Sequence, residues 1–84
     1  MEEEIKKFLD EMYRKYKNIT DEDGKLKREM NTTIYDFLYD NRSKIDNLPT
    51  TDIKAIEKYA IKLSNQFDDK WVGFAFLHSV TFAL

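Results

Sequence analysis

Residues 71–84, WVGFAFLHSVTFAL, decide how this chain folds. They include no Asp, Glu, Lys or Arg, and they have too many large apolar side chains to share one side of a helix. Some other surface must therefore cover part of the segment. We expect it to be either the hydrophobic centre of the protein or an interface with a second molecule. The residues expected in that core or oligomer interface are Trp71, Phe74, Phe76, Val80 and Phe82.

The composition describes a small, highly charged protein without cysteine. The chain has 84 residues, of which 36% are charged and 14% aromatic, and its formal net charge is −2. A chain of this length has room for one domain, residues 1–84, near the lower limit of independent stability. The lack of a basic excess argues against nucleic acid as a partner. Without cysteine, a secretion signal or an apolar run of about 20 residues, we expect a cytoplasmic protein with no membrane partner.

Apolar residues at helical spacing predict three amphipathic helices before the last segment. The three stripes are Ile5, Phe8, Leu9, Met12, Tyr13 and Tyr16; Leu26, Met30, Ile34, Phe37, Leu38 and Ile45; and Ile53, Ile56, Ala60, Leu63 and Phe67. The second helix is expected to begin at a cap formed by Thr20 or Asp21 and to run unbroken to about Asn47. The third is expected to begin at Thr50 to Asp52, just after Pro49.

Residues 71–84 fit two kinds of secondary structure. Val72, Phe74 and Phe76 also follow a period of two, and half of the segment is β-branched or aromatic, as in a strand. A lone strand needs a partner, however, and no other stretch predicts one, so a strand would require pairing between copies. A helix capped by Asp68 or Asp69 is favoured. The predicted fold is all-α, a single-domain bundle of four helices, with a strand at 71–84 as the alternative.

No motif for catalysis or metal binding is complete. The segment DEDGKL, residues 21–26, invites comparison with a calcium loop, but with Gly24 in the sixth position Ile19 and Met30 replace the first and last ligands. His78 is the only histidine, and we expect a buried or half-buried ring bonded to a carbonyl. Ser79 cannot be activated by its neighbour, because adjacent helical residues point about 100° apart. We therefore predict no catalytic residue, metal or cofactor, and a protein that is not an enzyme.

One side of the second helix has the composition of a binding surface. At 100° per residue, Tyr35 and Tyr39 fall opposite the apolar stripe, and Arg28 and Arg42 flank them. Exposed tyrosine and arginine combine a large contact area with a polar group, as do the residues that dominate protein–protein binding energies. The predicted partner-binding residues are Arg28, Tyr35, Tyr39 and Arg42. The alternative is that another helix covers the two tyrosines.

Two resemblances suggest the same mode of action. In size and helix pattern, the chain resembles the small helical immunity proteins that protect bacteriocin producers. Residues 67–72, FDDKWV, through His78, together with residues 16–20, YKNIT, resemble segments of phage proteins that sequester cyclic-oligonucleotide signals. Both resemblances imply small helical proteins that act by stoichiometric binding.

The function predicted from the sequence is binding without catalysis. We expect a small inhibitor, immunity or phage counter-defence protein that binds a protein partner stoichiometrically. The alternative is a sponge, a homodimer or larger oligomer built through residues 71–84, which binds a small anionic nucleotide. A nucleic-acid-binding regulator that uses Lys25, Lys27, Arg28 and Arg42 is disfavoured by the acidic balance of charge.

Overall fold

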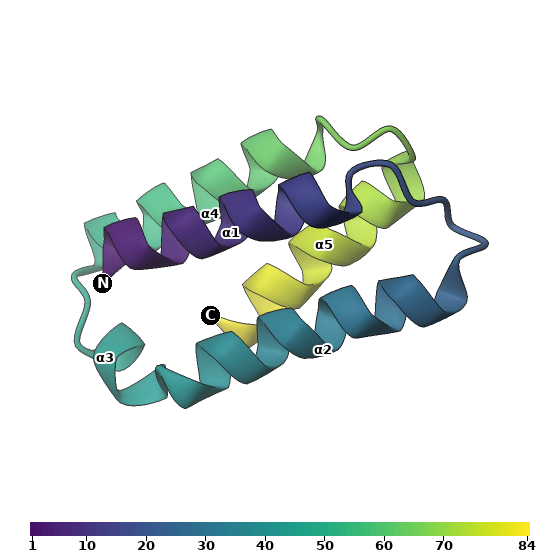
Figure 1. Ribbon diagram of the computed structural model, residues 1–84. Helices are drawn as coiled ribbons and strands as arrows, with labels where there is room; N and C mark the ends of the chain where they lie inside the picture. The colour runs from purple at the N-terminus through teal and green to yellow at the C-terminus, as the bar shows by residue number, and fades with distance from the viewer.

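The computed structural model describes all residues, 1–84, as five helices with no strand (Figure 1). The helices are α1 (Glu2–Tyr16), α2 (Gly24–Asp40), α3 (Arg42–Asp46), α4 (Thr50–Ser64) and α5 (Lys70–Ala83). The prediction of an all-α bundle is confirmed, and the strand alternative for residues 71–84 is wrong. None of the five helices combines the length and the apolar content that a membrane crossing requires.

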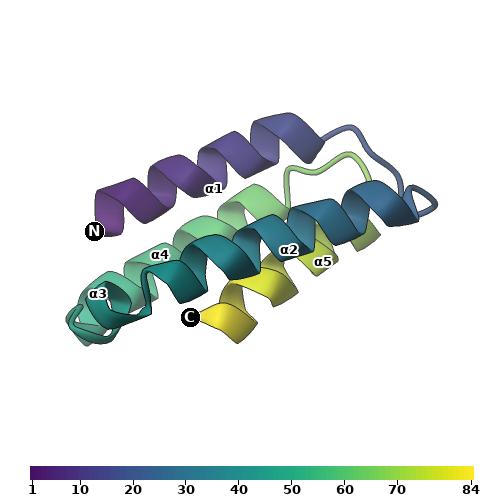
Figure 2. The same ribbon diagram turned by 60° about the horizontal axis from the view of Figure 1, so that its bottom comes forward.

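Helix α5 joins the two sides of the bundle. α1 and α4 run in one direction and α2 and α5 in the other (Figure 1). α5 packs against both α2 and α4, whereas α1 packs mainly against α4 and touches α2 much less (Figure 2). The apolar segment 71–84 therefore occupies the position on which the other long helices converge.

One cluster of buried apolar residues holds all five helices together. The buried members are Ile5, Leu9, Met12 and Tyr16 of α1, Met30, Ile34 and Leu38 of α2, Ile45 of α3, Ile56, Ala60 and Leu63 of α4, Phe67, and Val72, Phe76, Val80 and Ala83 of α5. The predicted stripes supply most of this core. Leu26 is an exception, being 40% exposed. It lies in the first turn of α2.

The predicted long second helix is interrupted at Asn41. The backbone there has φ −106° and ψ 18°, and the side-chain amide of Asn41 donates a hydrogen bond to the carbonyl oxygen of Phe37 at 2.8 Å. Asparagine side chains compete in this way for backbone groups that would otherwise continue the helix. The change of direction gives a fifth helix, α3, where four helices were predicted. It also places Ile45 in the core and Arg42 beside the end of α5.

Two tyrosine hydroxyls connect α1 to its neighbours. Tyr16 donates a hydrogen bond to Glu29 of α2 at 2.5 Å, and Tyr59 of α4 donates one to Asp10 of α1. Burial and the Glu29 carboxylate raise the pKa of Tyr16 to about 12. The hydrogen bond to Asp10 raises the pKa of Tyr59. Both rings therefore stay neutral well above physiological pH.

Asp69 caps the beginning of α5, as predicted from its position. Its Oδ1 accepts hydrogen bonds from the backbone N–H groups of Trp71 at 2.8 Å and Val72 at 3.4 Å. Its Oδ2 accepts the N–H of Asp21 at 2.9 Å, which ties the loop before α2 to α5. The capping prediction for α2 is wrong, because its N-cap is Asp23 and not Thr20 or Asp21. Asp23 accepts the N–H of Thr20 and thereby forms the turn before the helix.

Replacing Asp69 with alanine should lower the melting temperature at pH 7. The N–H of Asp21, followed by those of Trp71 and Val72, holds the pKa of Asp69 below its usual range, because these bonds favour the charged carboxylate. A depressed pKa adds stability that is present above the unfolded-state value and is lost as the pH falls below about 4. Thermal unfolding followed by circular dichroism should therefore show a gap between wild type and Asp69→Ala that closes in acid. Asp69→Asn, which keeps one acceptor oxygen, should lie between them. Equal melting temperatures at pH 7 would contradict this role.

Candidate functional site

Helix α5 has one buried face and one exposed face. Phe76 and Val80 are fully buried. Trp71, Phe74 and Phe82 are respectively 55%, 64% and 66% exposed. The five residues predicted as core or interface thus divide into two core residues and three that lie on the surface.

Exposed and half-buried rings form two groups over α5 and α2, Trp71 with Phe74 and His78 with Phe82, Tyr35 and Tyr39. We define the aromatic band as Trp71, Phe74, His78 and Phe82 of α5 with Tyr35 and Tyr39 of α2. Neighbouring ring centroids lie 6.2 Å apart for Trp71 and Phe74, 6.0 Å for His78 and Phe82, 5.9 Å for Phe82 and Tyr35, and 6.1 Å for Tyr35 and Tyr39. These separations lie within the range of favourable aromatic pairs. The rings therefore support one another on the surface.

Two contacts determine which face of α5 points outward. A Cβ atom placed on Gly73 would lie 2.2 Å from the carbonyl oxygen of Ser64, so α4 and α5 meet where only glycine fits. On the α2 side, the buried hydroxyl of Ser79 lies 2.6 Å from Oδ1 of Asn31. Gly73 and Ser79 must both face inward, and the aromatic side of α5 then faces solvent.

Arg42 binds the end of α5. Its Nη1 donates a hydrogen bond to the carbonyl oxygen of Leu84 at 3.1 Å, and its Nη2 donates to that of Ala83. The guanidinium carbon also lies 5.9 Å from the centre of the Tyr39 ring, within the range of cation–π contacts. A cation is favourable at a helix C-terminus, where the carbonyl groups have no partner within the helix. Arg42 therefore links the C-terminal end of α5 to the Tyr39 ring of α2.

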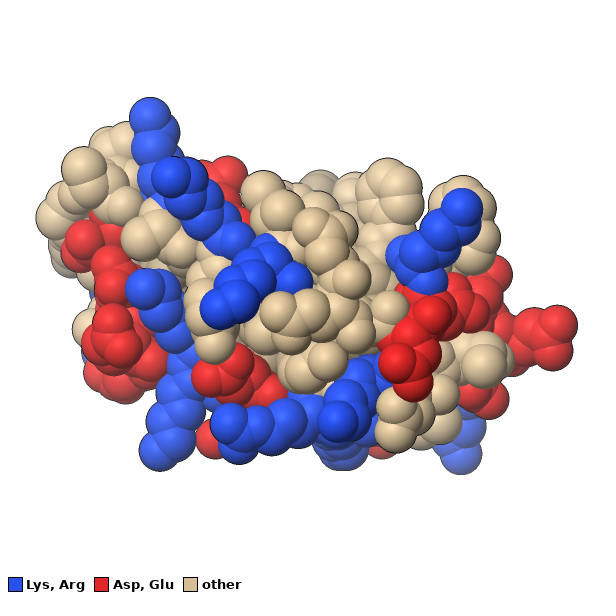
Figure 3. All heavy atoms as spheres, turned by 90° about the horizontal axis from the view of Figure 1, so that it is seen from above, with Lys and Arg blue, Asp and Glu red and all other residues tan.

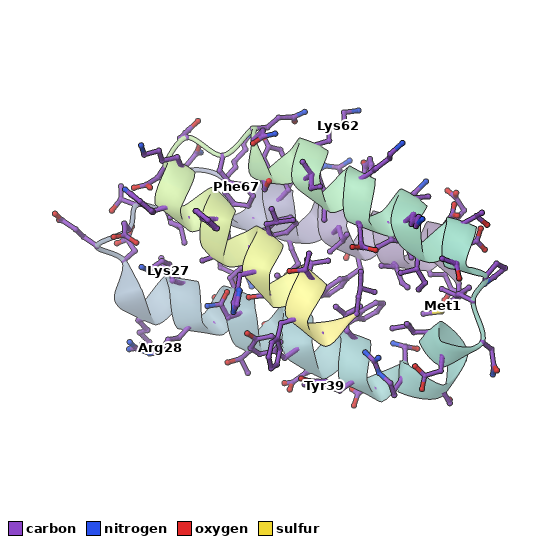
Figure 4. All side chains as sticks on the ribbon, turned by 180° about the vertical axis from the view of Figure 1, so that it is seen from behind. Met1, Lys27, Arg28, Tyr39, Lys62 and Phe67 are labelled. Atoms are coloured by element: carbon purple, nitrogen blue, oxygen red, sulfur yellow. The ribbon has the colours of Figure 1, made fainter.

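The structure brings together three of the four predicted partner-binding residues. Tyr35, Tyr39 and Arg42 are neighbours, with Tyr39 51% exposed. Tyr35 is half-buried because Phe82 of α5 packs against it, so the covered alternative applies to this tyrosine. Arg28 is exposed near the other end of α2, away from Tyr39 (Figure 4).

The part that α5 plays in this surface does not follow from the sequence. The helical spacing groups Tyr35 with Tyr39, but nothing in the sequence places Phe82 beside them. The expectation of a buried or half-buried His78 is wrong, because the ring is exposed on the outer side of α5. The positions 71, 74, 78 and 82 are separated by three, four and four residues, which places them on one side of a helix. The buried residues Val72, Phe76, Val80 and Ala83 have the same kind of spacing, so the sequence shows two apolar sides of this helix without showing which of them is exposed.

The band differs in charge from other parts of the surface. Seen from above, over α1 and α4, Lys, Arg, Asp and Glu side chains of both signs lie along one edge and at both ends of the molecule (Figure 3). Segment 71–84 has no charged side chain at all. The carboxylates of the loop before α2 already have partners within the protein. Asp21 forms an ion pair with Lys27, and Asp23 accepts a hydrogen bond from the N–H of Thr20. No group of three or more His, Asp or Glu side chains is arranged so that it could hold a metal ion.

Two small hollows lie beside the helices. The first, of about 180 Å³, lies between α4 and α5 and contains one cation, Lys70, among its lining residues. The second, of about 280 Å³, lies between α1 and α2, where the rings of Phe8 and Phe37 stack at 3.9 Å and Lys7 lies between Glu4 and Glu11 in sequence. Neither hollow contains more than one cation among its lining residues.

No family model matches this chain, and neither the curated proteins nor the solved structures contain a match to it.

Proposed function

We propose that this chain is a non-enzymatic binding module that occupies a protein partner stoichiometrically, as an inhibitor, immunity or counter-defence protein does. The site is the tyrosine cluster, which we define as Tyr35, Tyr39, Phe82 and Arg42. The observation that carries the proposal is the exposure of Tyr39 and Phe82, at 51% and 66%, beside an arginine. Exposed aromatic patches of this kind in a small protein mark interaction sites.

The geometry of the cluster favours tight contact with another protein. Tyr35 packs between Tyr39 and Phe82, and Arg42 is held by the carbonyl groups that end α5. Side chains that are already ordered lose little conformational entropy when a partner binds. Tyrosine and arginine are also enriched among the residues whose truncation costs the most binding energy. A rigid cluster of these types is therefore suited to recognition of a folded surface.

The surface charges favour a protein partner over the anionic nucleotide of the sponge alternative. A small nucleotide requires several cations or N–H groups directed at its phosphates. Lys70 is the only cation in one hollow, and Lys7 shares the other with Glu4 and Glu11. Arg42 is already bonded to two carbonyl oxygens. The cluster instead offers apolar rings with a few polar atoms at their edges.

Replacing Tyr39 with alanine should weaken partner binding by about 30-fold or more, the loss typical of a central interface residue. A photo-crosslinking amino acid at position 39 of the tagged full chain can first identify the partner in cells, and a titration with the purified partner then measures Kd. The matched control is Ile61→Ala, which truncates a residue of α4 that is 47% exposed and lies outside the cluster. Unchanged affinity for Tyr39→Ala, or an equal loss for Ile61→Ala, would refute the site.

A further inference from the structure

The outer side of α5 carries a stripe of rings along most of the helix. We define the α5 seam as Trp71, Phe74, His78 and Phe82, four residues of the aromatic band. Their spacing of three, four and four residues is that of the seam along which two helices pair. The seam extends over about 16 Å at 1.5 Å per residue. The seam is therefore an exposed apolar surface long enough to pack against another helix of similar length.

The area of the seam reaches the lower limit for a specific dimer. Taking about 200 Å² as the full surface of one large aromatic side chain, the exposed fractions of Trp71, Phe74 and Phe82 leave about 370 Å² of ring surface on each copy. Two copies that pair through their seams would bury roughly 700 Å² from these rings, and His78, Leu77 and Thr81 bring the total near the 1,000 Å² of a small specific interface.

Lys70, at the first position of α5, is the only charged side chain of this helix, and the uncharged remainder makes a second copy a suitable occupant. In a symmetric dimer, each residue of a surface meets residues of the same surface, so a charged patch would repel itself. Segment 71–84 contains no Asp, Glu, Lys or Arg, and pairing it with itself brings no like charges together. An antiparallel arrangement also places the positive N-terminal end of each helix dipole beside the negative C-terminal end of the other.

We propose that two copies of this chain form a two-fold symmetric dimer through the α5 seam, with the two α5 helices antiparallel. Trp71 of one copy then lies near Phe82 of the other, and Phe74 and His78 occupy the middle of the contact. Phe82 belongs to both surfaces, so the dimer covers one residue of the tyrosine cluster, whereas Tyr39 and Arg42 stay outside the seam. The dimer does not rest on the proposed partner binding, because Phe74 lies outside the tyrosine cluster and can be changed without altering it.

The mass of the full chain in solution tests the dimer. Analytical ultracentrifugation over a range of concentrations should give about twice the 10.1 kDa of one chain. Phe74→Glu should raise the dimer dissociation constant by at least about 100-fold, because it places two carboxylates in the middle of an apolar contact. Circular dichroism should show an unchanged fold, since Phe74 is a surface residue. Ile61→Glu introduces the same charge on α4 and should leave the dimer intact.

Single cysteines test the antiparallel arrangement, because the chain has none of its own. A mixture of Trp71→Cys and Phe82→Cys should form a mixed disulfide under mild oxidation, whereas either variant alone should not. Disulfides formed within each variant alone would overturn the antiparallel pairing. A wild-type chain that is monomeric at 100 micromolar and above would overturn the dimer, as would a dimer that survives Phe74→Glu. If the Phe74→Glu variant is monomeric and still binds its partner, the seam forms the dimer and partner binding does not require it.

Discussion

Replacing Phe76 with alanine is expected to cost about 3–5 kcal/mol of unfolding free energy, whereas the same change at Phe74 should cost less than about 0.5 kcal/mol. The two residues lie two positions apart in α5, and both are phenylalanine. Phe76 is fully buried, with the Phe67 ring 5.1 Å away, and its truncation leaves a cavity. Phe74 is 64% exposed and leaves none. A chain of 84 residues has a total stability of about 4–12 kcal/mol, so Phe76→Ala should remove a large part of it.

Urea denaturation followed by far-ultraviolet circular dichroism measures both variants in the same way. The experiment should use a protein concentration at which wild type and variants sediment as monomers, so that association through the α5 seam adds nothing to the measured free energy. The midpoint of Phe76→Ala should fall far below that of wild type, and that of Phe74→Ala should stay close to it. Similar losses at the two positions would mean that α5 is rotated differently on its neighbours.

The difference between Phe74 and Phe76 could not be predicted from the sequence. In α1 and α4, polar residues alternate with apolar ones at helical spacing, so residues such as Leu9 and Ile56 could be assigned to the core correctly. In α5 almost every position is apolar, and the pattern does not show which side faces inward. Segment 71–84 was therefore recognised as important without a division of its residues into core and surface.

The rotation of α5 depends on contacts between residues that are far apart in the sequence. Ser79 meets Asn31 of α2, and Gly73 meets the backbone of Ser64 in α4. Neither pairing follows from the local spacing of residues, because each requires the relative positions of two helices. Once α5 is oriented by these contacts, the exposure of Trp71 and Phe74 follows directly.

The candidate site was predictable only where a single helix contributes to it. Tyr35 and Tyr39 lie four residues apart on α2, so rotation by 100° per residue places them on the same side. Phe82 joins them from α5, and the chain bends at Asn41 before Arg42 reaches the end of α5. The sequence predicts an unbroken second helix in which Arg42 is a surface cation beside the two tyrosines. Its bonds to the α5 carbonyl groups make Tyr39 the better residue for a binding test.

Replacing Gly73 with alanine should destabilise the protein by at least about 2 kcal/mol, although alanine favours helices by about 1 kcal/mol over glycine. The added methyl group would lie 2.2 Å from the carbonyl oxygen of Ser64, and that oxygen belongs to the backbone of α4. A flexible side chain could move aside, but here two packed helices must separate. For a domain of this size, the change corresponds to a drop in melting temperature of about 8–16 °C.

The other glycine, Gly24, provides the matched control. A methyl group there would meet only the end of the flexible Arg28 side chain, at 3.5 Å, and Gly24 is the first residue of α2. Gly24→Ala should therefore leave the melting temperature unchanged or raise it, because alanine restricts the unfolded chain more than glycine does. Differential scanning calorimetry of the two variants then compares identical chemical changes at a tight and an open position. If Gly73→Ala were as stable as wild type, α5 could not approach α4 this closely, and the outward orientation of the aromatic band would lose one of the two contacts on which it depends.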